Sequence, residues 1–306
     1  MRICVAHETV YRYDTPASGV IQTLRLTPRN HNGQYVLNWR IDVSADCRLD
    51  PHEDAFGNII HAFSAGGPIS ELRLFAEGEV ETQDTAGVVR GAVERFPPSL
   101  FLRETALTHA DEALSVYAAQ FGCPVAADRL SVLHSLLARV HDDIAVDIEP
   151  AITGVTAVET FANQRGTCQG LTHVFITIAR ALGLPARYVS GYLHRPDGVA
   201  VQHGGQAQYQ DGQAQAGGDA QDGNHARGGN HGRDGGHAWA EAYVPDLGWV
   251  GFDPVNGLCV TDRYIRVAIG LDSLGAARVR GAFYGGGRET AAVMLQVTQA
   301  SWQTQG

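Results

Sequence analysis

The sequence predicts an α+β protein in which an antiparallel β region comes first and a mixed region of helices and strands follows. Two observations indicate this fold class. Polar and apolar residues alternate through most of the chain before residue 85, whereas apolar residues recur at three- and four-residue steps after residue 100. Because Phe96-Pro97-Pro98 interrupts both patterns, we expect a β-sandwich-like domain at residues 1–95 and a second domain at residues 96–306.

Five strands are expected in the first domain. The alternating pattern covers residues 3–13, 20–26, 35–43, 58–63 and 71–80. Residues typical of turns separate these runs, including Thr15-Pro16 and Gly66-Gly67-Pro68. The pattern therefore predicts an antiparallel sheet or sandwich.

The second domain begins with helices. Residues 100–121 and 129–143 carry apolar residues with helical spacing. Thr156 and Glu159 fit a capping box, which predicts the start of a short helix. Strand-like runs follow at 186–193, 238–244, 248–252, 263–269 and 291–299.

Residues 201–236 differ from the rest of the chain. They contain 11 Gly and 7 Gln, and Val201 and Tyr209 are their only large apolar residues. Such a segment buries too little apolar surface to offset the entropy lost on ordering, so we expect a flexible insertion. Two of its histidines, His225 and His231, are not expected to bind a metal with His237, because a flexible loop would not impose ligand geometry.

Composition excludes several classes of function. The 306-residue chain carries 23 basic and 33 acidic side chains, which gives a formal net charge of −10. This balance argues against a nucleic-acid partner and against docking on an anionic membrane, because both need clustered Lys and Arg. No apolar stretch approaches the roughly 18 residues of a membrane-spanning helix.

The cysteines and the start of the chain indicate a reducing compartment. The five cysteines are Cys4, Cys47, Cys123, Cys168 and Cys259. An odd number at wide, irregular spacing is typical of free thiols, and no CxxC pair indicates a zinc site. Since the first residues also lack an apolar signal segment, we expect a cytoplasmic protein without a metal or a cofactor.

Cys168 occupies a position that suits a nucleophile. It follows the loop-like Arg165-Gly166-Thr167 and begins a helical run that should end near Leu182, because Gly183 and Pro185 come next. Unpaired backbone N–H groups and the positive end of the helix dipole favour a thiolate at a helix start. The alternative role is that of a small, buried structural cysteine.

His237 and Asp253 supply the two groups that would activate this thiol. His237 begins the strand-like run after the insertion, and Asp253 lies at the end of the following run. A tight hairpin, Pro245-Asp246-Leu247-Gly248, joins the two runs and places His237 opposite a position near 256, within reach of Asp253. An imidazole that takes the thiol proton and a carboxylate that orients the imidazole complete a predicted triad with Cys168.

Substrate-binding candidates are fewer. The backbone N–H of Cys168 is expected to stabilise an oxyanion, with Gln164 or Gln169 as side-chain donors. Trp239 and Trp249 are expected to pack around the hairpin, and a role as substrate walls is the alternative. The candidate substrate contacts are Gln169, Trp239 and Trp249.

Several blocks of sequence resemble the transglutaminase-like superfamily, in particular its bacterial members with an N-terminal β region. The central blocks are 166–173 (GTCQGLTH), 183–192 (GLPARYVSGY), 237–239 (HAW) and 248–254 (GWVGFDP), and further blocks lie at 24–29, 54–58 and 263–270. The resemblance implies a papain-like core in which a catalytic cysteine at a helix N-terminus packs on an antiparallel sheet. It also implies the triad roles of Cys168, His237 and Asp253.

The implied reaction is acyl transfer on an amide bond through a thioester. Water would resolve the thioester in a peptidase or amidase, which we favour, whereas an amine would resolve it in a protein cross-linking transglutaminase. Two competing hypotheses are a non-catalytic binding protein and an accessory enzyme of peptide synthesis. The expected partner is a peptide or protein substrate.

Overall fold

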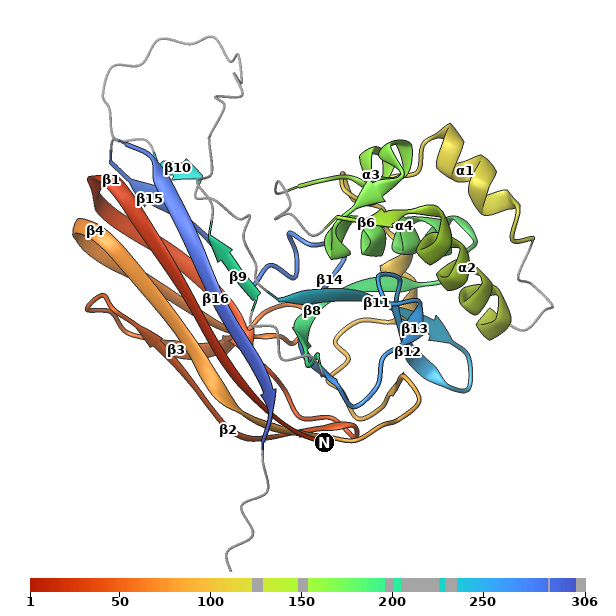
Figure 1. The fold of residues 1–306 in the computed structure, drawn as a ribbon, viewed down its shortest axis with the longest axis horizontal. Helices are drawn as coiled ribbons and strands as arrows, with labels where there is room; N and C mark the ends of the chain where they lie inside the picture. The colour runs from red at the N-terminus through yellow and green to blue at the C-terminus, as the bar shows by residue number, and fades with distance from the viewer. Residues whose placement is uncertain are drawn as a thin grey trace, which may run out of the picture.

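The protein folds around two antiparallel sheets, and helices cover one face of the second sheet (Figure 1). The computed structural model describes residues 1–122, 129–147, 154–195, 201–204, 226–228, 236–285 and 287–300. This arrangement confirms the predicted α+β fold class. No helix in these ranges is long and apolar enough to cross a membrane.

Within the described residues, the first sheet has eight strands and the second has six. The first sheet contains β1 (Arg2–Thr27), β2 (Gln34–Val43), β3 (Asp50–Glu53), β4 (Ile59–Thr82), β9 (Val201–Gly204), β10 (Ala226–Gly228), β15 (Val279–Tyr284) and β16 (Glu289–Gln299). The second contains β5 (Val88–Val89), β8 (Ala186–Leu193), β11 (His237–Val244), β12 (Gly248–Asp253), β13 (Leu258–Cys259) and β14 (Tyr264–Gly270). The remaining elements are η1 (Pro98–Leu102), α1 (Glu112–Ala119), α2 (Arg129–Asp143), α3 (Ala157–Asn163), α4 (Cys168–Ala181) and a short parallel pair, β6 (Ala145–Val146) and β7 (Arg165–Gly166).

The first sheet folds back on itself. β2 starts beside the beginning of β1, because Gln34 pairs with Thr82 and the Thr82 N–H donates to the Met1 carbonyl at 2.7 Å. The short link 28–33 between β1 and β2 spans at most about 20 Å, whereas a straight strand as long as β1 would span about 85 Å. β1 must therefore reverse its direction along its length, and buried residues from both of its halves, such as Tyr13 and Leu24, share one core cluster.

The reversal occurs where turns were predicted, but the strands are not interrupted. β1 continues through Thr15-Pro16 and β4 continues through Gly66-Gly67-Pro68, and the pairing between the two strands shifts register here. A bulged strand can turn a corner from one layer of a sandwich to the other without leaving the ladder. Glycine is needed at the corner, since a Cβ at Gly67 would lie 2.1 Å from the Ala17 carbonyl oxygen.

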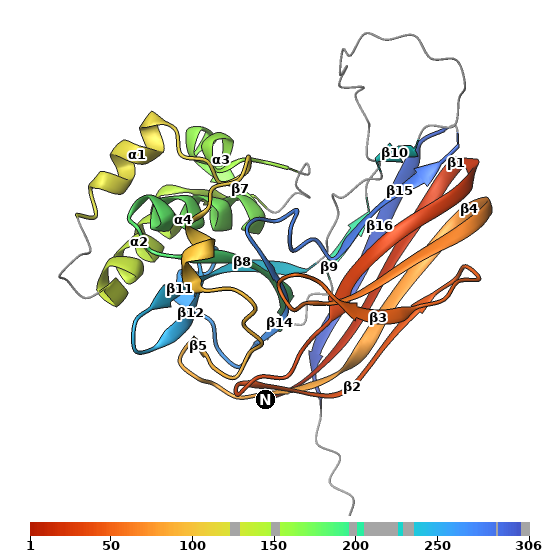
Figure 2. The same ribbon diagram turned by 180° about the vertical axis from the view of Figure 1, so that it is seen from behind.

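The C-terminal strands return to the first sheet. β15 and β16 pair with successive halves of β1, and Figure 2 shows β16 lying along it. Conversely, β5 pairs with β12 of the second sheet. The expected division at residue 95 therefore does not separate the two sheets, because the free edge of β1 takes its partner from residues 279–299.

Part of the insertion also joins the first sheet. β9 pairs with β16 and β10 pairs with β15, so these two pieces of residues 201–236 are strands and not the flexible loop that we expected. Their backbone groups continue the ladder at a sheet edge, which composition does not reveal. His225 and His231 lie outside the described residues.

Three of the four predicted helices are confirmed, and α4 begins at Cys168 as expected. α2 covers residues 129–143 as predicted, and the capping box between Thr156 and Glu159 opens α3. The continuous helix expected at 100–121 is wrong, because only η1 and α1 form there. The Asp111 carboxylate accepts a hydrogen bond from the Leu114 N–H at 2.8 Å, which starts α1 well after the expected position.

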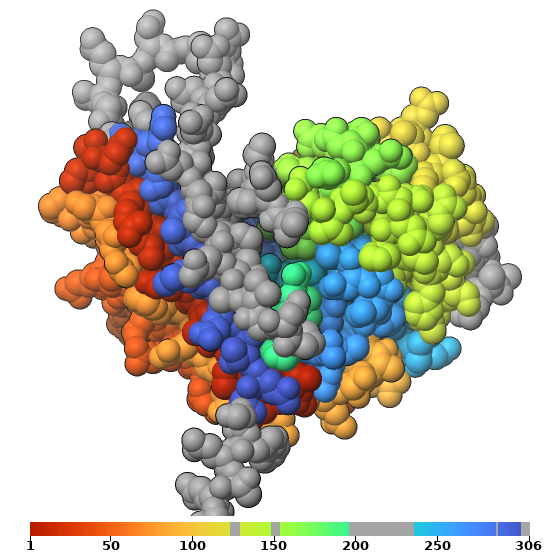
Figure 3. Space-filling view, viewed as in Figure 1, coloured from red at the N-terminus to blue at the C-terminus, as the bar shows by residue number. Residues whose placement is uncertain are grey.

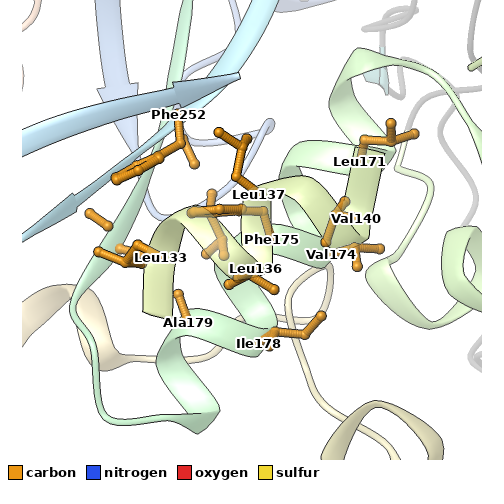
Figure 4. Packing of buried hydrophobic residues seen from close by; sticks show 14 of the residues in the cluster. Leu133, Leu136, Leu137, Val140, Leu171, Val174, Phe175, Ile178, Ala179 and Phe252 are labelled. Carbon is orange, nitrogen blue, oxygen red and sulfur yellow. The ribbon is translucent and has the colours of Figure 1, made fainter. Parts of the chain in front are cut away.

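A single core joins the helices to the second sheet (Figure 4). Leu171, Phe175 and Ile178 follow one stripe of α4 and are fully buried. They pack over the small side chains that β11 presents on this face, including Ala240, while the ring of Phe252 stacks on Phe175 with centroids 5.4 Å apart. This packing fixes α4, and hence its N-terminus, against the sheet.

The two sheets also share a core. Ile3 and Val80 of the first sheet pack against Tyr192 and Ile265 of the second, and all four are fully buried. Figure 3 shows the strands of the first sheet and the helical region as the two sides of one body. The position of β8 and β14 is therefore set partly by the first sheet.

A buried charge network lies within the second sheet. Glu241 of β11 accepts hydrogen bonds from Arg187 of β8 and from Arg266 of β14, each at 2.7 Å. Arg187 also donates to both carboxylate oxygens of Glu94, and its guanidinium lies 3.8 Å from the ring centroid of Trp249. Burial would raise the pKa of Glu241, but the two arginines outweigh it and lower that pKa to about 2.

We expect Glu241→Gln to lower the free energy of unfolding by about 3–5 kcal/mol, because it leaves Arg266 buried without its counter-charge and Arg187 with Glu94 alone. Urea titration measures this loss. The control is Asp42→Asn, whose ion pair with Arg40 is 52% and 68% exposed and should contribute less than about 0.5 kcal/mol. Similar losses in both variants would contradict the interpretation.

The same network predicts a pH dependence. The depressed pKa of Glu241 means that its stabilisation is complete above pH 4.5 and is lost as the pH falls toward about 2. The difference in unfolding free energy between wild type and Glu241→Gln should therefore shrink across this range.

Candidate active site

Cys168 is the first residue of α4. Thr167 precedes it in extended conformation and its side chain makes no capping hydrogen bond, so the positive end of the helix dipole acts directly on the thiol. The residue is partly buried and borders the helix–sheet core. Such a position stabilises negative charge on sulfur.

Glycines on both sides of Cys168 let another helix approach. A Cβ at Gly166 or at Gly170 would lie 2.6 or 2.5 Å from side-chain atoms of Thr160. Thr160 belongs to α3 and is fully buried. α3 therefore packs closely around the first turn of α4 and holds the thiol in place.

His237 and Asp253 meet across the β11–β12 hairpin. Ala240 pairs with Phe252 and Tyr243 with Trp249, which is within one residue of the register that the sequence predicts. The His237 Nε2 atom lies 2.6 Å from Asp253 Oδ2, and the side chains are 7% and 0% exposed. Because Nε2 faces the carboxylate, Nδ1 is the ring nitrogen left for Cys168.

The electrostatics of the pair favour an imidazolium. Burial alone would lower the pKa of His237, but the Asp253 carboxylate and a hydrogen bond with Cys168 raise it to about 9. Burial would raise the pKa of Asp253, but His237 and two further donors hold it below its ordinary value. The structure thus brings the three predicted triad residues together as a charged pair beside the thiol.

Two residues that the sequence interpretation missed complete the environment of Asp253. The Tyr264 hydroxyl donates to Asp253 Oδ2 at 2.7 Å, and Asn256 Nδ2 donates to the same oxygen at 2.6 Å. The backbone N–H groups of Val255 and Asn256 donate to Oδ1 at 2.9 and 3.3 Å. The Asp-Pro-Val-Asn-Gly sequence is a local turn signal that could have revealed Asn256, whereas no local signal marks Tyr264.

Helix α2 supports this loop from behind. His141 Nδ1 lies 3.2 Å from the Pro254 carbonyl oxygen, so the ring can donate a hydrogen bond to it. Gly257 has a φ of 65°, and a Cβ there would lie 2.8 Å from the His141 ring. The loop that carries the donors to Asp253 is therefore packed directly against the helix.

Of the three predicted substrate contacts, only Gln169 lies beside the thiol. Gln169 is the second residue of α4 and lies partly buried beside Cys168. Trp239 is only 1% exposed and packs between His237 and Tyr264, with centroids 6.4 and 5.4 Å from theirs. Its burial leaves no surface for a substrate, so the structure places it as a support of the base.

Trp249 also lies away from the thiol. It is 4% exposed, and together with Tyr243 it lines a pocket of ≈ 310 Å³ at the hairpin end of β11. Since His237 begins this strand and Tyr243 lies near its other end, the pocket is separate from the triad. The expected substrate role at the thiol therefore does not apply to Trp249.

Comparisons with known proteins agree with this fold. Residues 3–81 match the family model for the bacterial transglutaminase-like N-terminal region, and residues 125–254 match that for the transglutaminase-like superfamily. The chain belongs to the transglutaminase-like superfamily.

Individual relatives cover the chain almost completely. An uncharacterized protein of Mycobacterium leprae is 27% identical over 97% of this chain and 99% of its own length. An uncharacterized protein of Mycobacterium tuberculosis is 27% identical over 92% of this chain and 88% of its own. The crystal structure of a candidate cysteine protease from Cytophaga hutchinsonii has the same fold, with a TM-score of 0.70 and 15% identity over 99% of this chain and 92% of that chain.

The charged state of His237 gives a direct test. In NMR of protein with ¹³C-labelled histidine, we expect the His237 resonance to titrate at about pH 9. Asp253→Asn should lower this pKa, because burial then acts without the opposing carboxylate and only the contact with Cys168 still raises it. The buried His173, whose pKa burial lowers to about 4, should not change and is the internal control.

The sign of the linked stability follows from the raised pKa. The pairing of His237 stabilises the fold fully below pH 6.5 and this contribution is lost as the pH rises through about 9. A His237 resonance that titrates near 6.5 in both wild type and Asp253→Asn would contradict the ion pair.

Proposed function

We propose that the protein is a cysteine-dependent acyl-transfer enzyme that acts on amide bonds, with Cys168, His237 and Asp253 as its catalytic triad. The observation that carries this proposal is the buried His237–Asp253 pair, 2.6 Å apart, beside a thiol at a helix N-terminus. A structural histidine would not need a buried carboxylate held by two further side chains, whereas an imidazole that exchanges protons with a thiol does.

The first half-reaction uses all three residues. The Cys168 thiolate attacks the amide carbonyl carbon, and the carbonyl π electrons move to oxygen. The Cys168 backbone N–H at the helix start is positioned to donate to this oxyanion. When the C–N bond breaks, the imidazolium of His237 protonates the departing amine, and a thioester remains on Cys168.

In the second half-reaction, the site favours water over an amine as the group that resolves the thioester. Neutral His237 takes a proton from a water molecule that attacks the thioester, and the thiolate leaves with a free carboxylic acid as product. Cys168 is only partly buried, which favours access by water over its exclusion. The fold shared with a candidate cysteine protease also supports a peptidase or amidase.

A substrate screen with wild type and Cys168→Ala side by side tests this function. Casein, a glutamine-donor peptide with an amine acceptor, and D-amino-acid peptides cover the competing reactions. We expect wild type to release peptide or ammonia in the absence of amine, and Cys168→Ala to lose this activity by a factor of about 10³ or more. Activity that survives in Cys168→Ala would refute the nucleophile, and product formation only with amine would favour a cross-linking transglutaminase.

The orienting carboxylate should matter through kcat. Asp253→Asn is expected to lower kcat by roughly 10³- to 10⁴-fold, because the neutral Asn side chain favours the wrong tautomer of the His237 imidazole. Tyr264→Phe removes one of the donors to that carboxylate and should lower kcat by only about tenfold. An equal loss in both variants would contradict the proposed order of importance.

The partner and the location are also proposals. The substrate class that fits this chemistry is a peptide or protein with an accessible amide. Within the described chain Cys4, Cys47, Cys168 and Cys259 are free, which supports the proposed reducing, cytoplasmic location. Cys123 lies outside the described residues.

A further inference from the structure

A buried arginine outside the triad holds the backbone of His237. Arg278 lies just before β15 and is 2% exposed. Its Nη2 donates to the His237 carbonyl oxygen at 3.0 Å and also to the Gly191 carbonyl oxygen. His237 and Gly191 are register partners at the end of the β8–β11 ladder, so one guanidinium bridges the two strands where the base begins.

We propose that Arg278 is a positioning residue that fixes His237 against Cys168, an inference that rests on the proposed function. A guanidinium carries five donors in a rigid plane and can bind two carbonyls at once, which a lysine ammonium does less selectively. The bond to the His237 carbonyl constrains the backbone from which the imidazole projects. A displacement of about 1 Å at a catalytic group can cost about 10²-fold in rate.

The space around Arg278 is built for its guanidinium. A Cβ at Gly236, the residue before the base, would lie 2.0 Å from Arg278 Nη2. Glycine at this position therefore lets the arginine reach the His237 carbonyl. The guanidinium carbon also lies 5.2 Å from the ring centroid of Tyr192, which holds it from another side.

This contact connects the base to the first sheet. The Tyr192 hydroxyl and His7 Nδ1 are 3.0 Å apart, and His7 Nε2 lies 3.2 Å from the Thr9 hydroxyl. His7 and Thr9 belong to β1, and the Arg25 N–H of the same strand donates to the Arg278 carbonyl at 2.6 Å. The first sheet thus sets where the guanidinium sits, and through it where His237 begins β11.

The test measures how the rate of Cys168 alkylation by iodoacetamide depends on pH. Mass spectrometry of the peptide that contains Cys168 follows the reaction. In wild type His237 should keep the thiol reactive at acidic pH. In Arg278→Met the base is no longer fixed, and we expect alkylation at about pH 6 to slow by about tenfold or more. With any substrate found, kcat should fall by roughly 100-fold while KM stays within about threefold.

Two further variants keep the test valid if Arg278→Met does not fold. Gly236→Ala leaves the arginine in the chain, but its Cβ displaces the guanidinium, so it should produce the same shift of the alkylation profile. Arg278→Lys retains a donor to one carbonyl and should give an intermediate profile. Either result supports a positioning role, because it depends on the donor geometry at His237.

Arg180→Met is the matched structural control. Arg180 is 6% exposed and also donates to backbone carbonyls, those of Phe101, Ala186 and Leu271. Its loss should lower the melting temperature without changing the alkylation profile. A changed profile in Arg180→Met would show that general destabilisation suffices, which would overturn the inference.

The remaining outcomes separate the inference from the proposed function. If His237→Ala shifts the profile but Arg278→Met and Gly236→Ala retain that of wild type, the positioning role of Arg278 is refuted and the triad stands. If His237→Ala itself has the wild-type profile, the proposed function fails, and the inference fails with it.

Discussion

The Asp253 carboxylate is the group on which the site depends. It is fully buried and accepts five hydrogen bonds, from the imidazole, a phenol, an amide side chain and two backbone N–H groups. A buried charge that lost such partners would cost several kcal/mol, so the surrounding loop and strands must be in place before the carboxylate is stable as an anion. Once it is, the neighbouring His237 imidazole remains charged. The Cys168 thiol at the N-terminus of α4 then has a cation beside it.

The scaffold repeats this arrangement at a second point of the same sheet. Glu241 is likewise fully buried on β11, and arginines from β8 and β14 neutralise it. β11 therefore carries one half of each buried ion pair, His237 at its start and Glu241 near its middle. Register errors in this strand would separate both pairs at once, which makes its alignment with β8 and β12 unusually specific.

Local features of the fold could be predicted from the sequence, and distant ones could not. The bounds of α2, the capping box of α3, the helix start at Cys168 and the hairpin register near Asp253 all depend on residues close together in the chain. These signals arise from periodicity, capping and turn chemistry, which act within one or two turns of chain.

The missed features involve contacts between distant segments. Tyr264 reaches Asp253 from another strand, β14, and Arg278 reaches His237 from the position just before β15. Trp239 is of a residue type that often binds ligands, but its neighbours bury it, which the sequence pattern alone does not reveal. The corner of β1 looks like a turn between two strands in the sequence, because bulged strands and true turns use the same residues.

The pairing of β15 and β16 with β1 has a consequence for the order of folding. The first strand of the chain must wait for residues 279–299 before its second edge is occupied, so some of the longest-range contacts close last during synthesis. Arg278 arrives with the same segment. Until then the helices and the β11–β12 hairpin can form, but the base lacks its backbone support. A nascent or truncated chain would thus hold the thiol in an incompletely assembled site, and full nucleophilic reactivity would coincide with completion of the fold.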